Sequence, residues 1–164
     1  MLRGVDFLTV NLFAYGTLMT ADGLKGPLGR RVHGLVFRPA RLPGWRRVWN
    51  AYREEWQGGV LNVERAPSSS VLGVLVEGLT DGDFTHLDAQ EATHLPRETV
   101  MVEPRGGGPV LAQIYWLRQG NHKGGPSPRY QTVVLERARQ VGPAVYENLR
   151  TASVDSAGEP LVLA

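Results

Sequence analysis

Apolar and polar residues alternate in short runs over the first 116 positions, and Gly and Pro separate the runs. A period of two is typical of half-buried strands, while Gly and Pro are typical of the turns between them. The pattern predicts seven short strands, at 10–14, 32–39, 46–52, 59–64, 71–79, 99–103 and 110–116. The RGGGP run at 105–109 is expected to form a hairpin turn, because it lacks the GK[ST] ending of a phosphate loop.

Helical patterns follow the strands. Segment 80–91 offers Asp and Thr for an N-cap and then a short amphipathic helix. Ser127 and Pro128 suit the cap and first residue of a second helix, whose apolar residues recur at helical spacing. A Gly-Pro pair ends that helix and starts another over about 143–150, so that the two form a helical hairpin against the sheet. After Ala152 we expect either a mobile tail or a late strand.

No repeat, heptad pattern or long linker divides the 164 residues, so we expect one domain over 1–152 and a tail over 153–164. A chain of this length can bury a core without disulfide or metal staples. Cysteine is absent, which excludes disulfides, thiolate metal ligands and cysteine nucleophiles. This composition suits a reducing compartment, and the cytoplasm is the expected location.

Charge and hydropathy limit the partners. Arg3 and Asp6 interrupt the apolar residues at the start of the chain, and no stretch approaches the about 20 apolar residues of a membrane span. We therefore expect no export signal and no membrane contact. The formal net charge is only +2, which is weak support for a nucleic-acid partner.

The most basic segment, RLPGWRRVWNAYR at 41–53, mixes Arg with aromatic residues. This composition suits a protein that stacks single-stranded nucleic acid. The alternation of Arg47, Trp49 and Ala51 with the residues between them equally suits a twisted strand whose Arg side chains face solvent. We favour the second interpretation and expect no nucleic-acid partner.

The FAYGTL segment at 13–18 is an apolar strand that runs directly into Tyr15-Gly16-Thr17. Glycine lets a ligand approach the main chain, and successive N–H groups in such a turn can form a concave site for a carboxylate. A strand that simply ends in an ordinary turn would give the same letters. The segment alone leaves both interpretations open.

Glu91 is the acid best placed for chemistry. In the short helix it follows Phe84 by seven residues and Leu87 by four, so it shares their apolar face. Burial disfavours a charged carboxylate and raises its pKa toward the range where it can exchange a proton near neutral pH. Alternatively, Glu91 is a structural acid paired with Arg97. Asp88 lies near the same face, as a supporting acid or an edge residue.

Other routes to catalysis have little support in the sequence. His33, His86, His94 and His122 lack the i,i+4 pairing of a helical zinc site, so we expect no metal. The serines at 68–70 lie outside any GxSxG elbow. Acid/base chemistry by one carboxylate is what remains.

Six motifs together resemble the γ-glutamylcyclotransferase family. They occur in order as YGTL at 15–18, ARLPGWRRVWN at 40–50, GGVLNVERAP at 58–67, VLGVLVEGL at 71–79, LDAQE at 87–91 and PSPRY at 126–130. The resemblance implies an α+β fold, with a small mixed β-barrel of about six or seven strands. A short helix would carry the catalytic acid, and a helical hairpin would end the domain.

The implied reaction is intramolecular aminolysis, in which the α-amino group of a γ-glutamyl compound attacks its own γ-carbonyl and releases 5-oxoproline and an amine. By motif, Glu91 takes the family's acid/base position. The substrate-binding turn falls on Tyr15, Gly16, Thr17 and Leu18, and Tyr130 closes the pocket. The implied partner is a small γ-glutamyl molecule, and no cofactor is required.

The chain departs from the family in the segment EATHLPR, where Ala92 follows Glu91 and Leu95 lies two residues before Arg97. Relatives often have Gly and an aromatic residue there, so we expect a difference where this loop borders the substrate. The turn reads YGTL, whereas some relatives have YGSNL. This difference makes the chain more similar to the branches of the family that act on γ-glutamyl amines. A binding module on the same barrel, without turnover, is the alternative function. Some family members are dimers, and a homodimer is left open.

Overall fold

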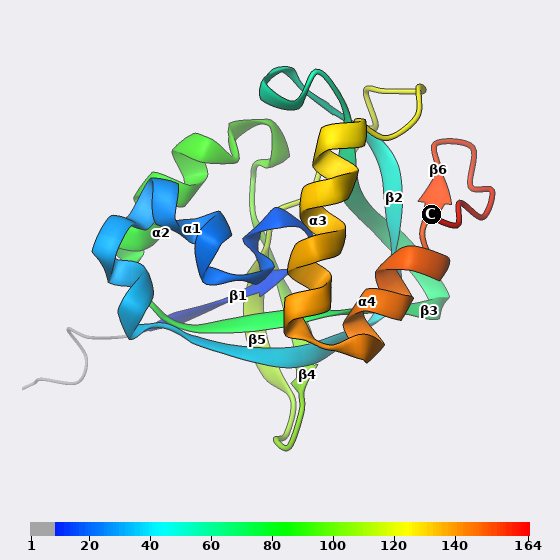
Figure 1. Ribbon diagram of the computed structural model, residues 1–164. Coiled ribbons are helices and arrows are strands. Elements are labelled where there is room, and N and C mark those ends of the chain that lie inside the picture. Colours follow the sequence, from blue (N-terminus) through cyan, green and yellow to red (C-terminus); the bar gives the residue numbers. More distant parts are fainter. Residues whose placement is uncertain (1–8) are drawn as a thin grey trace, which may run out of the picture.

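The computed structural model describes residues 9–164 (Figure 1). Residues 1–8 lie outside the described residues. The start of the expected domain 1–152 falls there, and so does the N-terminal segment for which we expect no export signal. The elements are β1 (Val10–Ala14), η2 (Thr17–Met19), α1 (Ala21–Leu28), η3 (Gly29–Gly34), β2 (Val36–Arg53), η4 (Glu54–Trp56), β3 (Gly58–Leu79), α2 (Asp81–Gln90), η5 (Ala92–His94), β4 (Glu98–Pro104), β5 (Val110–Ile114), α3 (Pro128–Val141), α4 (Pro143–Thr151) and β6 (Val154–Asp155).

Five of these strands close into a small barrel. The order is β3-β1-β5-β4-β2, and β2 pairs again with β3 to close the ring. Strands β1 and β5 run parallel, whereas the other barrel pairs are antiparallel, so the barrel is mixed. The inward positions of β1 and β3 are apolar and buried, as in Leu12 and Leu75. The predicted mixed barrel is confirmed.

Strands β2 and β3 form one long hairpin where the sequence predicts four separate strands. Pairing runs from Val36 opposite Glu77 to Arg53 opposite Gly58. Pro43 lacks an N–H donor, and Gly44 adopts a φ of +87° beside a shift in register. A bulge of this kind bends a strand without ending it. Residues 32–34, expected in a strand, belong to η3.

Helix α1 was not predicted, because its sequence ADGLKGPL contains two Gly and a Pro, which are poor helix formers. Leu24 and Leu28 are four residues apart and both are buried, so packing compensates for the low propensity. A Cβ at Gly23 would lie 1.8 Å from the carbonyl oxygen of Thr17. The glycine therefore allows α1 to lie directly against the segment that follows β1.

Helix α2 begins as predicted. The Thr80 hydroxyl accepts a hydrogen bond from the Asp83 amide, and the Asp83 carboxylate accepts one from the Thr80 amide, which makes a capping box. Phe84 and Leu87 are buried. In Figure 1, α1 and α2 lie together at one side of the barrel, and they are in contact.

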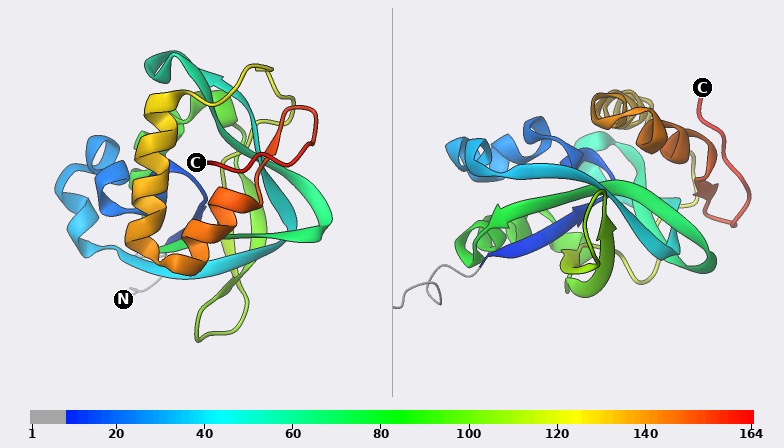
Figure 2. Two further views of the ribbon diagram at one scale, coloured as in Figure 1. Left: turned by 45° about the vertical axis from the view of Figure 1, so that its right-hand side comes forward. Right: turned by 90° about the horizontal axis from the view of Figure 1, so that it is seen from below.

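The C-terminal helical hairpin is also confirmed. The Ser127 hydroxyl caps α3, Pro128 is its first residue, and α4 begins at Pro143. Figure 2 shows α3 and α4 packed side by side across one face of the barrel, while the β4–β5 hairpin projects away from it. After α4, Val154 and Asp155 pair in parallel with β2, so part of the expected tail is a short strand. No helix within residues 9–164 is long and apolar enough to cross a membrane.

Candidate active site

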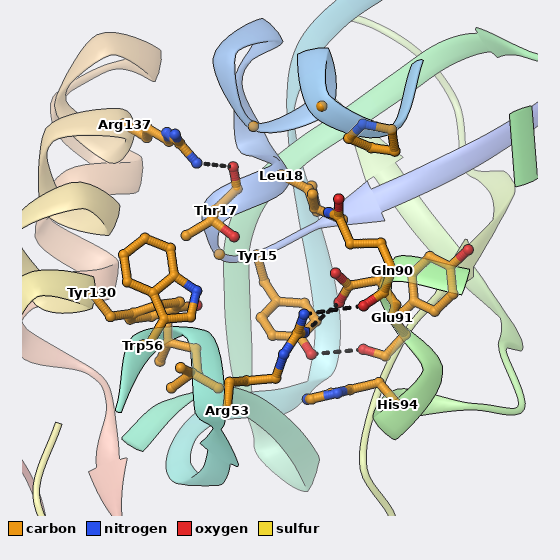
Figure 3. Close-up of a pocket in the computed structure, with 18 of the residues that line it drawn as sticks. Tyr15, Thr17, Leu18, Arg53, Trp56, Gln90, Glu91, His94, Tyr130 and Arg137 are labelled. Atoms are coloured by element: carbon orange, nitrogen blue, oxygen red, sulfur yellow. Dashed lines mark hydrogen bonds and ion pairs between the residues drawn. The ribbon is translucent and has the colours of Figure 1, made fainter. Parts of the chain in front are cut away.

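A cavity of about 300 Å³ opens between the end of β1, the helices α1 and α3, and the C-terminal end of α2 (Figure 3). Its volume is at the lower end of the range for small-molecule sites. The structure brings all six site residues expected from the sequence to its wall. They are Tyr15, Gly16, Thr17, Leu18, Glu91 and Tyr130.

Two arginine side chains bind the carbonyl groups of the turn after β1. The Arg47 Nε donates to the carbonyl of Tyr15 at 2.8 Å, and an Arg137 Nη donates to the carbonyl of Thr17 at 2.8 Å. The Tyr15 hydroxyl donates to the carbonyl of Tyr115 at 2.6 Å, so that side chain is anchored as well. Two cations and one tyrosine thereby fix the backbone of the turn.

Gly16 is required by the space around it. Its φ of −135° is open to any residue, so freedom at positive φ is not the reason for glycine here. A Cβ would lie 2.8 Å from the hydroxyl oxygen of Tyr130. The missing side chain therefore lets the Tyr130 hydroxyl approach the main chain of the turn.

Arg47 contradicts the expectation that the arginines of segment 41–53 face solvent. It is 2 % exposed, and its remaining donors reach the Asn148 side chain and the carbonyl of Leu72, both at 2.7 Å. Burial lowers the pKa of its guanidinium to about 9. Arg47 shares one face of β2 with Trp49 and Ala51. Both of these residues are buried, so the position of Arg47 in the strand is consistent with its burial.

Glu91 terminates α2 instead of lying within it. Its amide donates to the carbonyl of Leu87, and its carbonyl accepts from the amide of His94, both at 2.8 Å. The backbone is thus fixed on both sides, and the side chain is 13 % exposed at the cavity wall. Figure 3 shows the carboxylate across the cavity from the turn.

Opposing influences act on the pKa of the Glu91 carboxyl, and burial and Arg53 come first among them. Burial raises its pKa, and this effect exceeds the opposing one of Arg53, whose Nη lies 3.4 Å from the carboxylate. The alternative pairing of Glu91 with Arg97 is wrong, because the Arg97 guanidinium binds Asp88 at 2.8 Å. Asp88 also accepts a hydrogen bond from the Tyr115 hydroxyl at 2.6 Å, and so ties α2 to the end of β5.

His94 lies on the same wall and is 3 % exposed. Burial, together with the charge of Arg53, lowers the pKa of its ring to about 4. The imidazole is therefore neutral near pH 7. Within residues 9–164, no group of three or more metal-binding side chains gathers around it.

Tyr130 closes the opposite side of the cavity. Its ring meets Trp56 and Trp49 edge-on, with centroids 5.1 and 5.7 Å apart. The Ser127 hydroxyl accepts from the Tyr130 amide and donates to the carbonyl of Trp56, which links α3 to η4. Burial raises the pKa of the Tyr130 hydroxyl, so it stays protonated near neutral pH.

Sequence reasoning missed the contributions of Arg53, Trp56, Arg137 and helix α1 to this wall. Arg53 lies 38 positions from Glu91, and nothing in the local pattern marks the pair. Arg137 lies within the helical pattern that follows Pro128, which does not mark it as a site residue. The closing of the barrel brings these segments together, which explains why local pattern does not mark them as parts of the site.

Comparison with known proteins identifies the family of the chain. The family model "Gamma-glutamyl cyclotransferase, AIG2-like" matches residues 12–134. A solved gamma-glutamyl cyclotransferase aligns with a TM-score of 0.73 at 21% identity, over 85% of this chain and 84% of that one. An uncharacterized protein from Homo sapiens aligns at 0.71 and 20% identity, over 82% and 80%.

A gamma-glutamyl cyclotransferase from yeast that is specific to glutathione has the same fold, with a TM-score of 0.57 at 12% identity, over 86% of this chain and 95% of that one. A search of curated proteins finds no match. These structural likenesses show the fold, and the family match, which spans more than half of the chain, shows the family. The chain belongs to the γ-glutamyl cyclotransferase, AIG2-like family.

Proposed function

We propose that this protein converts a γ-glutamyl amino acid or γ-glutamyl amine into 5-oxoproline and the free amine, with Glu91 as general acid and base. The observation that carries the proposal is the Glu91 carboxyl, which lines the cavity, faces the turn and has a pKa raised by burial. A carboxyl with such a pKa is suited to accept and return a proton near neutral pH.

The glutamyl half of the substrate lies along the turn. The carbonyls of Tyr15 and Thr17 are bound by Arg47 and by Arg137, of which Arg137 also lines the cavity. This arrangement leaves the amides of Gly16, Thr17 and Leu18 for the α-carboxylate of the substrate. Tyr130 closes the far side and offers its protonated hydroxyl next to Gly16.

The reaction then needs only proton transfer and correct folding of the substrate. Glu91 removes a proton from the α-ammonium, and the free amine attacks the γ-carbonyl carbon to close a five-membered ring. The bond to the leaving nitrogen breaks as Glu91 delivers a proton to it. The ring nitrogen gives up its second surplus proton, which the released amine takes up to become an ammonium, so substrate and products carry the same protons. Holding the reacting atoms in place can contribute about 7 to 11 kcal/mol, and no cofactor enters the scheme.

The test uses purified protein with γ-glutamyl dipeptides, γ-glutamyl amines and glutathione, with 5-oxoproline measured by mass spectrometry. Glu91→Gln keeps the shape of the side chain but cannot exchange a proton, so release should fall by about 10²- to 10⁴-fold. Glu55→Gln is the matched control, since Glu55 also lines the cavity and pairs with Arg53. It should retain release within about tenfold.

The alternative of a binding module makes the opposite prediction. A folded protein that binds γ-glutamyl compounds in calorimetry, yet releases no 5-oxoproline from any of them, would refute turnover. Equal loss in the Glu55 and Glu91 variants would refute the specific role of Glu91.

A further inference from the structure

Arg53 is the only arginine among residues 9–164 whose guanidinium contacts Glu91. It is the last residue of β2, it lines the cavity, and its side chain is 13 % exposed. One Nη donates to the carbonyl of Gln90 at 3.0 Å and also binds Glu55. The guanidinium is thus anchored on one side, at the end of the cavity that contains the acid.

The contacts of Arg53 leave room for a further acceptor. The Nη that faces Glu91 makes only a long contact, at 3.4 Å, and Nε has no hydrogen-bond acceptor within residues 9–164. Glu55, its other carboxylate partner, has a 55 % exposed side chain and can be hydrated when the arginine turns. A guanidinium that has free donors and is only 13 % exposed binds a carboxylate strongly.

In the proposed function, Glu91 protonates the leaving nitrogen, so this nitrogen lies next to Glu91. In a γ-glutamyl α-amino acid, a carboxylate is attached one carbon away from that nitrogen. The distance between Arg53 and Glu91 therefore puts a cation where this second carboxylate would be. We propose that Arg53 is a specificity-determining residue that binds the carboxylate on the leaving amine, and so selects γ-glutamyl α-amino acids.

The distribution of charge in the cavity supports this assignment, which rests on the proposed function. Arg137 lines the cavity beside the turn at one end, and Arg53 lies beside Glu91 at the other (Figure 3). A γ-glutamyl α-amino acid likewise has two carboxylates, one at each end. The assignment differs from the preference for amines that the YGTL turn implies, and experiment can separate the two.

The sharpest test compares γ-glutamylalanine with γ-glutamylethylamine, which differ only by the carboxylate on the leaving amine. For the wild type, kcat/KM should be at least about tenfold higher for γ-glutamylalanine, as expected for a charge-assisted hydrogen bond. In Arg53→Met the ratio should fall to near one, and Arg53→Lys should give an intermediate value. Arg139→Met, on the exposed face of α3, should keep the wild-type ratio.

The ratio is taken within each variant, so a smaller folded fraction or a changed Glu91 cancels. A wild-type ratio near one, or an Arg53→Met ratio equal to the wild type, would overturn the assignment. If the wild type releases 5-oxoproline from other γ-glutamyl compounds of the panel but not from γ-glutamylalanine, the assignment fails and the proposed function stands; release from none of them refutes both. The need for a free carboxylate on the leaving amine also predicts a higher kcat/KM for γ-glutamylcysteine than for glutathione. In glutathione, the cysteine carboxyl is part of a peptide bond.

Discussion

The two ends of the cavity are built on different physical principles. At the turn, Arg47 and Arg137 bind backbone carbonyls and hold a fixed set of amides. At the end of α2, Glu91, Arg53 and His94 interact through charge and burial, and two of them have pKa values shifted by that burial. The turn is therefore a binding surface with a fixed backbone, whereas the end of α2 contains groups whose protonation changes with pH. Substitutions at the two ends should therefore change different measurements.

The largest effect is expected from Arg47→Met, which should lower the free energy of unfolding by about 3 to 5 kcal/mol. The change removes the guanidinium donor from the carbonyls of Tyr15 and Leu72, and it leaves the Asn148 side-chain oxygen with the Leu72 amide as its donor. Chemical denaturation measures it. Arg46→Met, which breaks only a half-exposed pair with Glu64, should cost less than about 1 kcal/mol. Equal costs would show that Arg47 does not support the turn.

At the α2 end of the cavity, protonation of His94 should lower the free energy of unfolding in acid. Its pKa is about 4 when folded and about 6.5 in an unfolded chain, so the unfolded state binds a proton first as the pH falls. Stability is then lost from about pH 6.5 down to about pH 4, by roughly 3 kcal/mol. The difference in unfolding free energy between the wild type and His94→Gln, followed across this range, measures the loss. Parallel curves would contradict it.

At the turn after β1, Gly16→Ala should reduce kcat/KM by about 10- to 100-fold, because the new Cβ pushes the turn or the Tyr130 hydroxyl out of place. Steady-state kinetics with the best γ-glutamyl substrate measures the effect. Gly108→Ala is the control, since its Cβ would meet nothing within 4 Å. If both variants behave alike, the close approach at Gly16 is irrelevant to activity.

The smallest effect is expected from Glu55. Its negative charge raises the pKa of Glu91, but this contribution is the smallest of those that act on Glu91. Glu55→Gln should therefore move the acid limb of the kcat/KM profile to lower pH, by less than about one unit. An unchanged acid limb, or a shift to higher pH, would contradict this influence of Glu55 on Glu91.

Sequence reasoning located the parts of the fold that local chemistry controls. The capping box at Thr80 and the Ser127 cap with Pro128 are signals that need no tertiary context, and both helices begin at these residues. Helix α1 was missed because packing of Leu24 and Leu28 outweighs its glycines. The long β2–β3 hairpin was divided at Pro43, where a bulge maintains the pairing.

The site was predictable only in part for the same reason. Glu91 stands out locally, because its spacing from Phe84 and Leu87 puts a carboxylate beside buried residues. Its partner does not, since Arg53 reaches it from the end of another strand. Charge pairs across a closed barrel depend on register and closure, which the periodicity of single segments does not specify.

The central claim is that burial in the cavity prepares Glu91 to carry a proton. It is tested most directly by an NMR titration of the carboxyl carbons of the ¹³C-labelled protein, with the Glu91 signal assigned by its loss in Glu91→Gln. The account predicts a midpoint clearly above the ordinary glutamate value of about 4.3, and an acid limb of kcat/KM with the same midpoint. A midpoint at or below that value would contradict it.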